Sequence, residues 1–287
     1  LMGSGDWNDG MNNVGIQGKG ESVWLAFFLY HVLTRFAEMA DLRGDGEFAS
    51  TCRSEAETLR SRIEMHGWDG AWYLRAYFDD GTPLGSNASP ECQIDSIAQS
   101  WSVLSGGGDP ARTRSAMDSV DRQLVDREHA LVKLLEPPFD TSGLDPGYIK
   151  GYLPGVRENG GQYTHAAIWA SMAFAALGDA ERACELLGLI DPVGHSISPQ
   201  AANVFRVEPY VVTGDVYATA PHVGRGGWSW YTGSAGWMYR AITESILGLR
   251  LEAGRLRIAP CIPKSWSGFE ATYRHVDTTY AIVVVQK

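Results

Sequence analysis

Two carboxylates flank a tryptophan near the start of the chain. Asp6, Trp7 and Asp9 lie in the glycine-rich run of residues 3–12, Gly-Ser-Gly-Asp-Trp-Asn-Asp-Gly-Met-Asn. Cleavage of a glycosidic bond needs a carboxylic acid that reaches the bridging oxygen, and glycines allow a backbone to approach a ligand closely. An indole ring also matches the flat face of a pyranose. These residue types predict a sugar-cleaving site, although an Asx turn that leads into a helix would use the same aspartates.

The loop of residues 147–165 combines aromatic, charged and glycine residues ahead of a predicted helix. Arg157 and His165 have the chemistry to meet an anion, while Glu158 either braces the loop or acts as the general base of a hydrolase. His165 also lies on the apolar stripe of the helix, where a lone histidine is more often a packed core residue. The loop therefore predicts an anion contact, with a structural histidine as the alternative.

A second loop, residues 222–237, has a similar composition. Its Thr232-Gly233-Ser234 turn opens a predicted helix, whose free N–H groups attract an anion. His222 and Arg225 either add a further anion contact or brace the loop. This segment predicts the second half of an anion site.

Composition limits the class of partner. The chain has 287 residues and a formal net charge of −10, which disfavours nucleic acid and anionic lipid because both need a basic face. No apolar run approaches the roughly 20 residues that cross a bilayer. The four cysteines lie far apart without metal-binding spacing, so we expect reduced, buried thiols, no metal site and a cytoplasmic location.

Helical periodicity dominates the first 247 residues, and strand alternation follows. The pattern predicts helices over about 21–41, 53–66, 94–104, from 110 onward, and over 165–176, 180–189 and 238–249. It predicts a hairpin over 249–258, strands over 269–275 and 278–285, and long loops over 67–93, 136–162 and 205–236. Long loops in a compact domain are usually functional. We expect a mainly α fold, a partial α/α toroid over 1–247, and the start of a small antiparallel β domain over 248–287.

Several segments, taken in order, resemble the glycoside hydrolase family 94 phosphorylases, which include cellobiose and chitobiose phosphorylases. The likeness is greatest to the C-terminal region of cyclic β-1,2-glucan synthases. It rests on Gly-Asp-Trp-Asn-Asp-Gly-Met-Asn, Gly-Lys-Gly-Glu-Ser-Val-Trp, Glu-Cys-Gln-Ile-Asp-Ser-Ile-Ala-Gln-Ser-Trp, Arg-Glu-Asn-Gly-Gly and Trp-Tyr-Thr-Gly-Ser-Ala. Any one of these is weak, but together they span nearly the whole chain.

The resemblance implies an (α/α)6 barrel with a small β domain after it, and inverting phosphorolysis of a β-glucoside to an α-sugar 1-phosphate. It assigns the general acid to Asp9 and a donor-sugar contact to Asp6 and Trp7. It assigns phosphate binding to His165, Thr232, Gly233 and Ser234. It assigns further sugar binding to Tyr152, Arg157 and Glu158. Arg157 stands where the family commonly has lysine.

Phosphorolysis agrees with a site that has one acid. An inverting hydrolase needs a second carboxylate to activate water, with the pair about 6.5–9.5 Å apart. Phosphate is already an anionic nucleophile, so a cationic pocket with a protonated His165 and a helix N-terminus replaces the base. Inorganic phosphate is then a co-substrate, and no cofactor is expected.

Two rival interpretations stay open. An inverting β-glucosidase of the same toroid would release glucose without phosphate and would use a carboxylate such as Glu158 opposite Asp9. A non-catalytic glucan-binding region would bind sugar through Trp7 and Trp228 without turnover.

The resemblance also implies partners beyond this chain. Family members carry an N-terminal β domain and a further phosphate-binding arginine ahead of the Asp-Trp-Asn-Asp motif, so we expect the chain to be a piece of a longer polypeptide and inactive alone. The expected partners are a β-glucan oligosaccharide, phosphate, the preceding part of the same polypeptide and, as in many relatives, a second subunit in a homodimer. A cytosolic region of an inner-membrane synthase would fit this picture.

Overall fold

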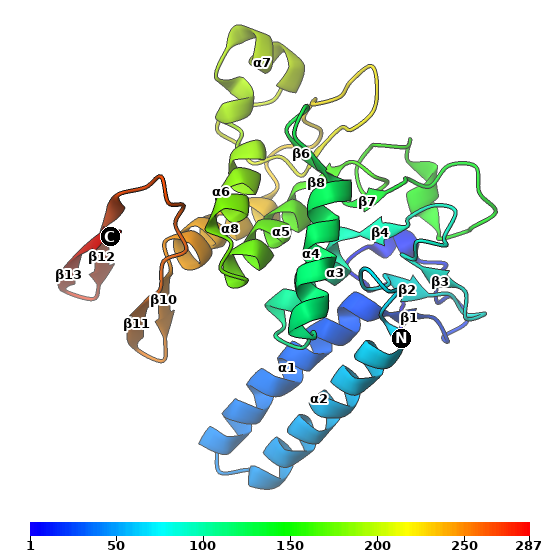
Figure 1. Ribbon diagram of the computed structural model, residues 1–287, viewed down its shortest axis with the longest axis horizontal. Coiled ribbons are helices and arrows are strands. Elements are labelled where there is room, and N and C mark those ends of the chain that lie inside the picture. The colour runs from blue at the N-terminus through cyan, green and yellow to red at the C-terminus, as the bar shows by residue number, and fades with distance from the viewer.

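The computed structural model describes residues 1–287 and is built mainly from helices joined by long loops (Figure 1). Two long antiparallel helices, α1 and α2, project from a group of shorter ones. The helices are α1 (Val23–Leu42), α2 (Gly46–His66), α3 (Ser96–Leu104), α4 (Pro110–Leu124), α5 (Thr164–Ala176), α6 (Ala180–Leu189), α7 (Pro199–Phe205) and α8 (Thr232–Arg240). A π-helical turn, Ala241–Ile246, extends α8.

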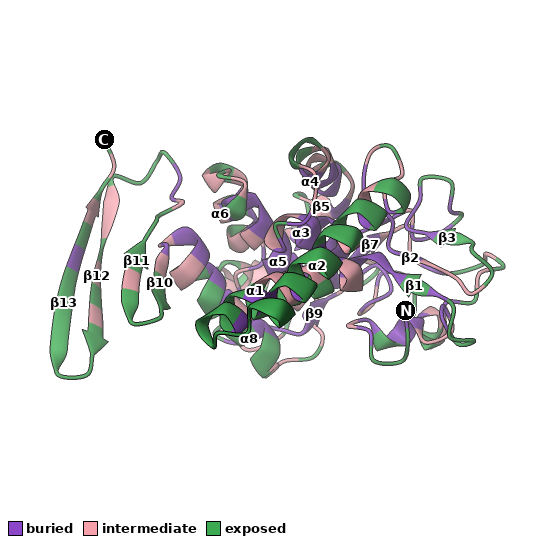
Figure 2. Ribbon diagram, turned by 90° about the horizontal axis from the view of Figure 1, so that it is seen from below, coloured by how far each residue is buried: buried purple, intermediate pink, exposed green.

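The largest core cluster surrounds α5, which packs against α3, α6 and α8. Ile168, Trp169, Ala173 and Phe174 of α5 are all buried, and Figure 2 shows the buried colour concentrated where these helices meet. A helix that is apolar on most of its surface belongs at the centre of a domain. The helix that carries His165 is therefore held rigidly by its neighbours.

Helix α2 begins earlier than the predicted Arg53. The Asp45 carboxylate accepts a hydrogen bond of 3.1 Å from the Phe48 N–H and caps the helix at Gly46. The inward residues of the first turns are small, Ala49, Cys52 and Ala56. Small inward residues give a weak apolar periodicity, so the sequence pattern missed these turns.

Helix α7 was not predicted. It lies just ahead of the predicted loop 205–236 and overlaps it only at Phe205, with the Ser198 hydroxyl as its cap and Pro199 at its first position. The helix is short and lacks an apolar stripe, so its cap signals alone did not reveal it. Helix α8 begins at Thr232, where the Thr232-Gly233-Ser234 turn was predicted to open a helix, six residues ahead of the apolar stripe that starts at Met238.

The predicted loops are tied together by short antiparallel strand pairs. Strands β1 (Glu21–Ser22), β2 (Ala76–Tyr77) and β3 (Pro83–Leu84) form one small sheet. The other pairs are β4 (Ile94–Asp95) with β7 (Leu135–Glu136), β5 (Val125–Asp126) with β6 (Leu131–Val132), and β8 (Gln162–Tyr163) with β9 (Asp215–Val216). These pairs fix loops that are distant in sequence, and two-residue strands are too short to give a periodic signal.

Two hairpins form the last part of the structure, where the alternation predicted one hairpin and two further strands. Strands β10 (Leu249–Glu252) and β11 (Arg255–Ile258) pair, as do β12 (Gly268–His275) and β13 (Thr278–Val285). Ala253 and Gly254 in the first turn both have positive φ, 46° and 74°, the conformation that a two-residue hairpin needs. Figure 2 shows both hairpins at one end of the molecule, beyond α6.

The structure confirms a mainly helical fold with small antiparallel sheets. The partial toroid and the domain division at residues 247 and 248 remain predictions. None of the helices combines the length and the apolar character needed to cross a membrane. All four cysteines are free; Cys52 and Cys92 are buried as expected, whereas Cys184 and Cys261 are half-buried.

Candidate active site

Asp6 anchors the loop that carries Asp9. One Asp6 carboxylate oxygen accepts a hydrogen bond from the Asn8 N–H at 3.0 Å, and the other accepts from the Ser22 hydroxyl at 2.8 Å and the Trp24 indole N–H at 2.9 Å. The same carboxylate forms an ion pair with Arg75. Its side chain has no exposed surface. The structure therefore shows Asp6 buried beneath the loop, where its hydrogen bonds and ion pair hold the loop in place.

Arg75 is the centre of a fully buried charge cluster. It pairs with Asp6, lies 3.4 Å from the Asp95 carboxylate and donates a 3.0 Å hydrogen bond to the Ser22 hydroxyl. Burial acts to raise the pKa of Asp6, but the Arg75 guanidinium and the hydrogen bonds outweigh it and hold that pKa below its usual range. Burial raises the pKa of Asp95 to about 6. One cation thus serves two carboxylates, and Asp95 is the one that takes up a proton first as the pH falls.

Asp9 begins a short 3-10 helix, Asp9–Met11, and its side chain is exposed. The helix packs on a second 3-10 turn, Tyr148–Gly151, so closely that a Cβ on Gly10 would lie 3.0 Å from the Ile149 Cβ. The Tyr148 hydroxyl lies beside the Asp9 carboxylate; burial first, and then this carboxylate, raise the pKa of Tyr148. Asp9 is therefore an accessible carboxyl group with one phenol as its neighbour.

Trp7 joins the Asp9 loop to α5. Its ring centroid lies 5.2 Å from that of Tyr163, 5.5 Å from that of His165 and 5.7 Å from that of Trp169. The first two contacts are edge-to-face, the geometry that aromatic pairs prefer. Trp7 is half-buried, so one part of the indole packs and the rest is accessible.

His165 lies between indole rings and keeps an unpartnered nitrogen. Its ring is 4.3 Å from Trp169 and is stacked at 5.7 Å on Trp237 of α8. The Nε2 atom is buried and has no hydrogen-bond partner. Burial lowers the pKa of His165 to about 4, so the ring is neutral at pH 7. The protonated His165 that we expect with phosphate bound stays a prediction; without a ligand the ring is neutral, and its Nε2 is buried without a partner.

The three residues that open α8 differ in exposure. Thr232 and Gly233 are exposed, and no side chain caps the helix, so its first N–H groups are free. Ser234 is buried, and its hydroxyl donates to the Tyr231 carbonyl at 3.0 Å. A free helix N-terminus favours an anion. The structure places Thr232 and Gly233 at that end and turns Ser234 inward.

Arg157 is held between two aromatic rings. Its guanidinium carbon lies 5.1 Å from the Tyr152 ring centroid and 4.5 Å from that of Trp228, which are cation–π distances. Its Nε atom is 3.3 Å from the Glu158 carboxylate. Arg157 also has a left-handed backbone, with φ of 51°. The predicted sugar-site residues Tyr152, Arg157 and Glu158 thus form one cluster. The ring centroid of Tyr152 lies 6.2 Å from that of Tyr148, the residue beside Asp9.

Sequence reasoning missed three buried charges and one phenol at this site. Asp215, only 2% exposed, accepts a 3.0 Å hydrogen bond from the Trp228 N–H and pairs across β8–β9 with Tyr163. Burial raises its pKa. Arg75 had a signal, because it interrupts the apolar run Trp-Tyr-Leu-Arg-Ala-Tyr and a charge in such a run needs a partner. No sequence signal indicated the contacts of Asp95, Asp215 and Tyr148, because their partners are distant in sequence.

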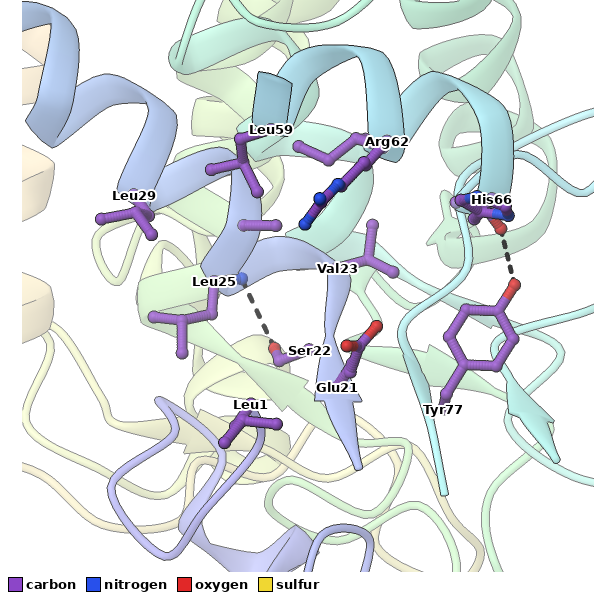
Figure 3. Close-up of a pocket in the computed structure, with 13 residues that line it drawn as sticks. Leu1, Glu21, Ser22, Val23, Leu25, Leu29, Leu59, Arg62, His66 and Tyr77 are labelled. Carbon is purple, nitrogen blue, oxygen red and sulfur yellow. Dashed lines mark hydrogen bonds between the residues drawn. The ribbon is translucent and has the colours of Figure 1, made fainter. Parts of the chain in front are cut away.

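A cavity of about 420 Å³ lies elsewhere, between α1 and α2 beside the first residue (Figure 3). Leu25, Leu59 and Arg62 line it, and Tyr77 donates a 2.6 Å hydrogen bond to the His66 carbonyl at its edge. None of the predicted site residues lines this cavity. The candidate site residues are instead linked by contacts between loops. Asp9 lies beside Tyr148, whose ring is near that of Tyr152 under Arg157. Trp7 contacts His165, which stacks on Trp237 of α8.

Comparisons with known proteins place these loops in a family. The family model described as "Glycosyl hydrolase 94 superfamily, catalytic domain" matches residues 1–248. The cyclic beta-(1,2)-glucan synthase NdvB of Rhizobium meliloti (strain 1021) is 52% identical over 284 residues, 99% of this chain and 10% of that protein. Solabiose phosphorylase of Paenibacillus borealis is 33% identical over the whole of this chain and 37% of that protein. The N,N'-diacetylchitobiose phosphorylase of Vibrio furnissii is 34% identical over 97% of this chain and 34% of that protein.

Solved structures support the fold. A structure described as "Sialidase" aligns with 95% of this chain and 24% of its own, at a TM-score of 0.64 and 14% identity. A structure described as "Glycosidase Wild Type" aligns with 78% of this chain and 51% of its own, at a TM-score of 0.52 and 15% identity. At such identities the likeness concerns the fold alone. The chain spans a tenth to little more than a third of the length of the relatives named above. On the match over residues 1–248, the chain belongs to the glycosyl hydrolase 94 superfamily, a family of glycoside-processing enzymes.

Proposed function

We propose that this chain carries the acid and much of the phosphate site of an inverting glycoside phosphorylase. The observation that supports it most is the contact between Trp7 and His165, with ring centroids 5.5 Å apart. It brings the loop of the candidate acid next to a buried, unpartnered nitrogen and to the helix whose N-terminus is free. An acid beside an anion-binding pocket is what phosphorolysis needs.

In the proposed reaction Asp9 donates its proton to the glycosidic oxygen as the bond to C1 breaks. A phosphate oxygen forms the new bond to C1 from the opposite face, which inverts the β-configuration to an α-sugar 1-phosphate. The leaving sugar takes the proton as a hydroxyl, and Asp9 remains as a carboxylate. The reverse reaction returns the proton to Asp9. No second carboxylate is needed, because phosphate itself is the nucleophile.

Phosphate would be held by His165, Thr232 and Gly233. The neutral His165 offers an N–H from its free nitrogen, and phosphate bound there would favour its protonation, since an opposite charge offsets burial. Thr232 offers its hydroxyl, and the first N–H groups of α8 add their dipole. Ser234 would act by fixing this turn through its bond to Tyr231.

The sugar would lie over Trp7 and against the cluster of Tyr152, Arg157 and Glu158. The accessible part of Trp7 offers a stacking surface, while Asp6 would support the sugar site only by holding the loop. The 52% identity to a protein named as a cyclic beta-(1,2)-glucan synthase favours a β-1,2-glucan as substrate. Because the chain is a small share of that protein, activity would need the flanking sequence. The cytoplasmic location and the homodimer stay predictions.

The test is product identity. The protein that contains this chain, with its flanking sequence, is incubated with β-1,2-gluco-oligosaccharides with and without phosphate, and products are identified by NMR. We expect α-glucose 1-phosphate only when phosphate is present. Free glucose at equal rates without phosphate would establish an inverting glucosidase, and binding without any product would establish a glucan-binding region.

A further inference from the structure

The loop between α7 and α8 exposes two large aromatic rings that the proposed reaction does not use. Tyr210 is 73% exposed and Trp230 is 67% exposed. Their ring centroids are 6.4 Å apart at an angle of 75°. In Figure 1 this loop is yellow and lies at the top of the molecule, beside the green loops of residues 136–162. Large aromatic side chains in a soluble protein are mostly buried, so this pair calls for an explanation.

Trp230 is held in a fixed orientation. Its indole N–H donates a 3.0 Å hydrogen bond to the Glu208 carboxylate. Its backbone is left-handed, with φ of 63°, which is rare for a residue as bulky as tryptophan. Strained backbone of this kind persists mainly at functional sites. The ring is therefore held in an exposed position by specific contacts.

Glu208 adds a polar group to the pair. The N–H of Glu208 itself, then the Trp230 indole and the Ser229 side chain, lower the pKa of Glu208, so the carboxylate is ionised at neutral pH. One oxygen accepts the indole N–H. An apolar protein partner would have to desolvate this charge, which is costly. A ligand with hydroxyl groups would instead donate to it.

The aromatic pair is continuous with the candidate active site. Trp228, two residues before Trp230, lies 4.5 Å from the Arg157 guanidinium. The Gly214 N–H donates a 2.6 Å hydrogen bond to the Trp228 carbonyl, and Asp215 accepts from the Trp228 N–H. The exposed rings thus lie on the same tied loop as a wall of the proposed sugar site. A ligand that extends from that site along this loop would reach these rings.

We propose that Tyr210, Trp230 and Glu208 form a distal binding site for sugar units of a glucan chain whose end lies in the candidate active site. Sugar rings present C–H faces that stack on aromatic rings, and hydroxyl groups that donate to a carboxylate. The inference rests on the proposed function for the identity of the ligand. A disaccharide, which fills only the reaction centre, would not reach the distal site.

The test compares substrate lengths in the protein with its full flanking sequence. Variants Trp230→Ala, Trp230→Phe and Tyr210→Ala are compared with Trp266→Ala, an exposed tryptophan near the C-terminal hairpins. The rate of sugar 1-phosphate release gives kcat/KM for a β-1,2-linked disaccharide and for long β-1,2-gluco-oligosaccharides. Isothermal titration of the same ligands into the Asp9→Asn background gives affinity without turnover.

We expect Trp230→Ala to lower kcat/KM and affinity for the long ligands about fivefold to tenfold, through KM, and to leave the disaccharide unchanged. Trp230→Phe should restore most of the loss, and Trp266→Ala should change nothing. Equal losses at both lengths, or no loss at either, would overturn the distal site. If the wild type binds long glucans but releases no sugar phosphate, the proposed function fails. The titrations then still show whether Trp230 and Tyr210 contribute to the binding of long glucans.

Discussion

At the scale of single residues, the candidate acid depends on a buried ion pair that the sequence did not reveal. Asp6 shares the Asp-Trp-Asn-Asp motif with Asp9, yet the structure gives the two aspartates different surroundings. The Asp6 side chain has no exposed surface and four protein partners, whereas Asp9 is exposed beside Tyr148. The motif predicted both as sugar-site groups. The position of Arg75, sixty-nine residues further along the chain than Asp6, distinguishes their surroundings.

We predict that Asp6→Asn is strongly destabilising. The change leaves Arg75 buried with only Asp95 to balance its charge, and breaking one partner of a buried pair costs about 3–5 kcal/mol. Chemical denaturation of the chain measures the loss. Asp145→Asn is the control, because Asp145 is exposed and also accepts a hydrogen bond from this loop, from Asn13 at 3.0 Å. Similar small losses for both variants would mean that the pair does not support the loop.

Asp95 gives a prediction of opposite sign that depends on pH. Its pKa is raised to about 6 in the folded chain, above the ordinary 3.8, so its contribution to stability is fully present below pH 3.8 and is lost as the pH rises through 6. Asp95→Asn stays neutral and keeps an oxygen to cap α3 at Ile97. We expect this variant to raise the free energy of unfolding by about 1–3 kcal/mol at pH 8 and to change it little at pH 4.5. A loss of stability at pH 8 would show that ionised Asp95 is favourable beside Arg75.

At the scale of elements, the short pair β8–β9 brings the two halves of the site together. Tyr163 lies opposite Asp215, and the Asp215 carboxylate and carbonyl hold Trp228 and Gly227. Strand β8, which contains Tyr163, leads directly into α5 and His165. One two-residue pair therefore sets the distance between the Arg157 loop, the Trp228 loop and the helix that carries His165.

We predict that Gly227→Ala disrupts this pair. A Cβ at residue 227 would overlap both oxygens of the Asp215 carboxylate, which is buried and has little room to move. Overpacking of this kind costs about 1–3 kcal/mol, so thermal unfolding should occur several degrees lower. Gly188→Ala is the matched control: it lies exposed in α6 with open space around its Cβ, and should be neutral or slightly stabilising. Equal melting temperatures for both variants would contradict the close packing.

The sequence predicted those elements that carry a stripe of large apolar residues. Helices α1 and α5 and the final hairpins were predicted to within a few residues, because periods of 3.6 and 2 are local signals. The first turns of α2 and all of α7 lacked such a stripe. The two-residue strands, and with them the partners Arg75 and Asp215, depend on long-range pairing that no local pattern records. The grouping of Asp9, Trp7 and His165 followed from family resemblance and not from spacing.

At the scale of the whole molecule, α1 exposes a line of large side chains. Leu29, Val32, Phe36 and Met39 lie on one side of the helix, and Met39 is 58% exposed. The chain also spans only 34–37% of the two phosphorylases that it resembles. The domain division and the toroid are properties at this scale, and they remain predictions.

We predict that the isolated 287-residue chain releases no sugar phosphate, whereas the protein with its flanking sequence does. The family resemblance assigns a phosphate-binding arginine to the sequence ahead of the motif, and one fewer cation weakens a phosphate site that has a neutral histidine. Parallel assays of the two proteins, with circular dichroism to confirm that the shorter one is folded, check this. Full turnover by the short chain would show that the site is complete within these residues.

The central claim is that Asp9 is the general acid, and one comparison tests it most directly. Asp9→Asn and wild type, both with the flanking sequence, are assayed with phosphate on a β-1,2-gluco-oligosaccharide and on β-glucosyl fluoride, whose leaving group needs no proton. We expect the variant to lose about 10²–10⁴ in kcat on the oligosaccharide and to retain most activity on the fluoride. Equal losses on both substrates, or none on the oligosaccharide, would contradict the assignment.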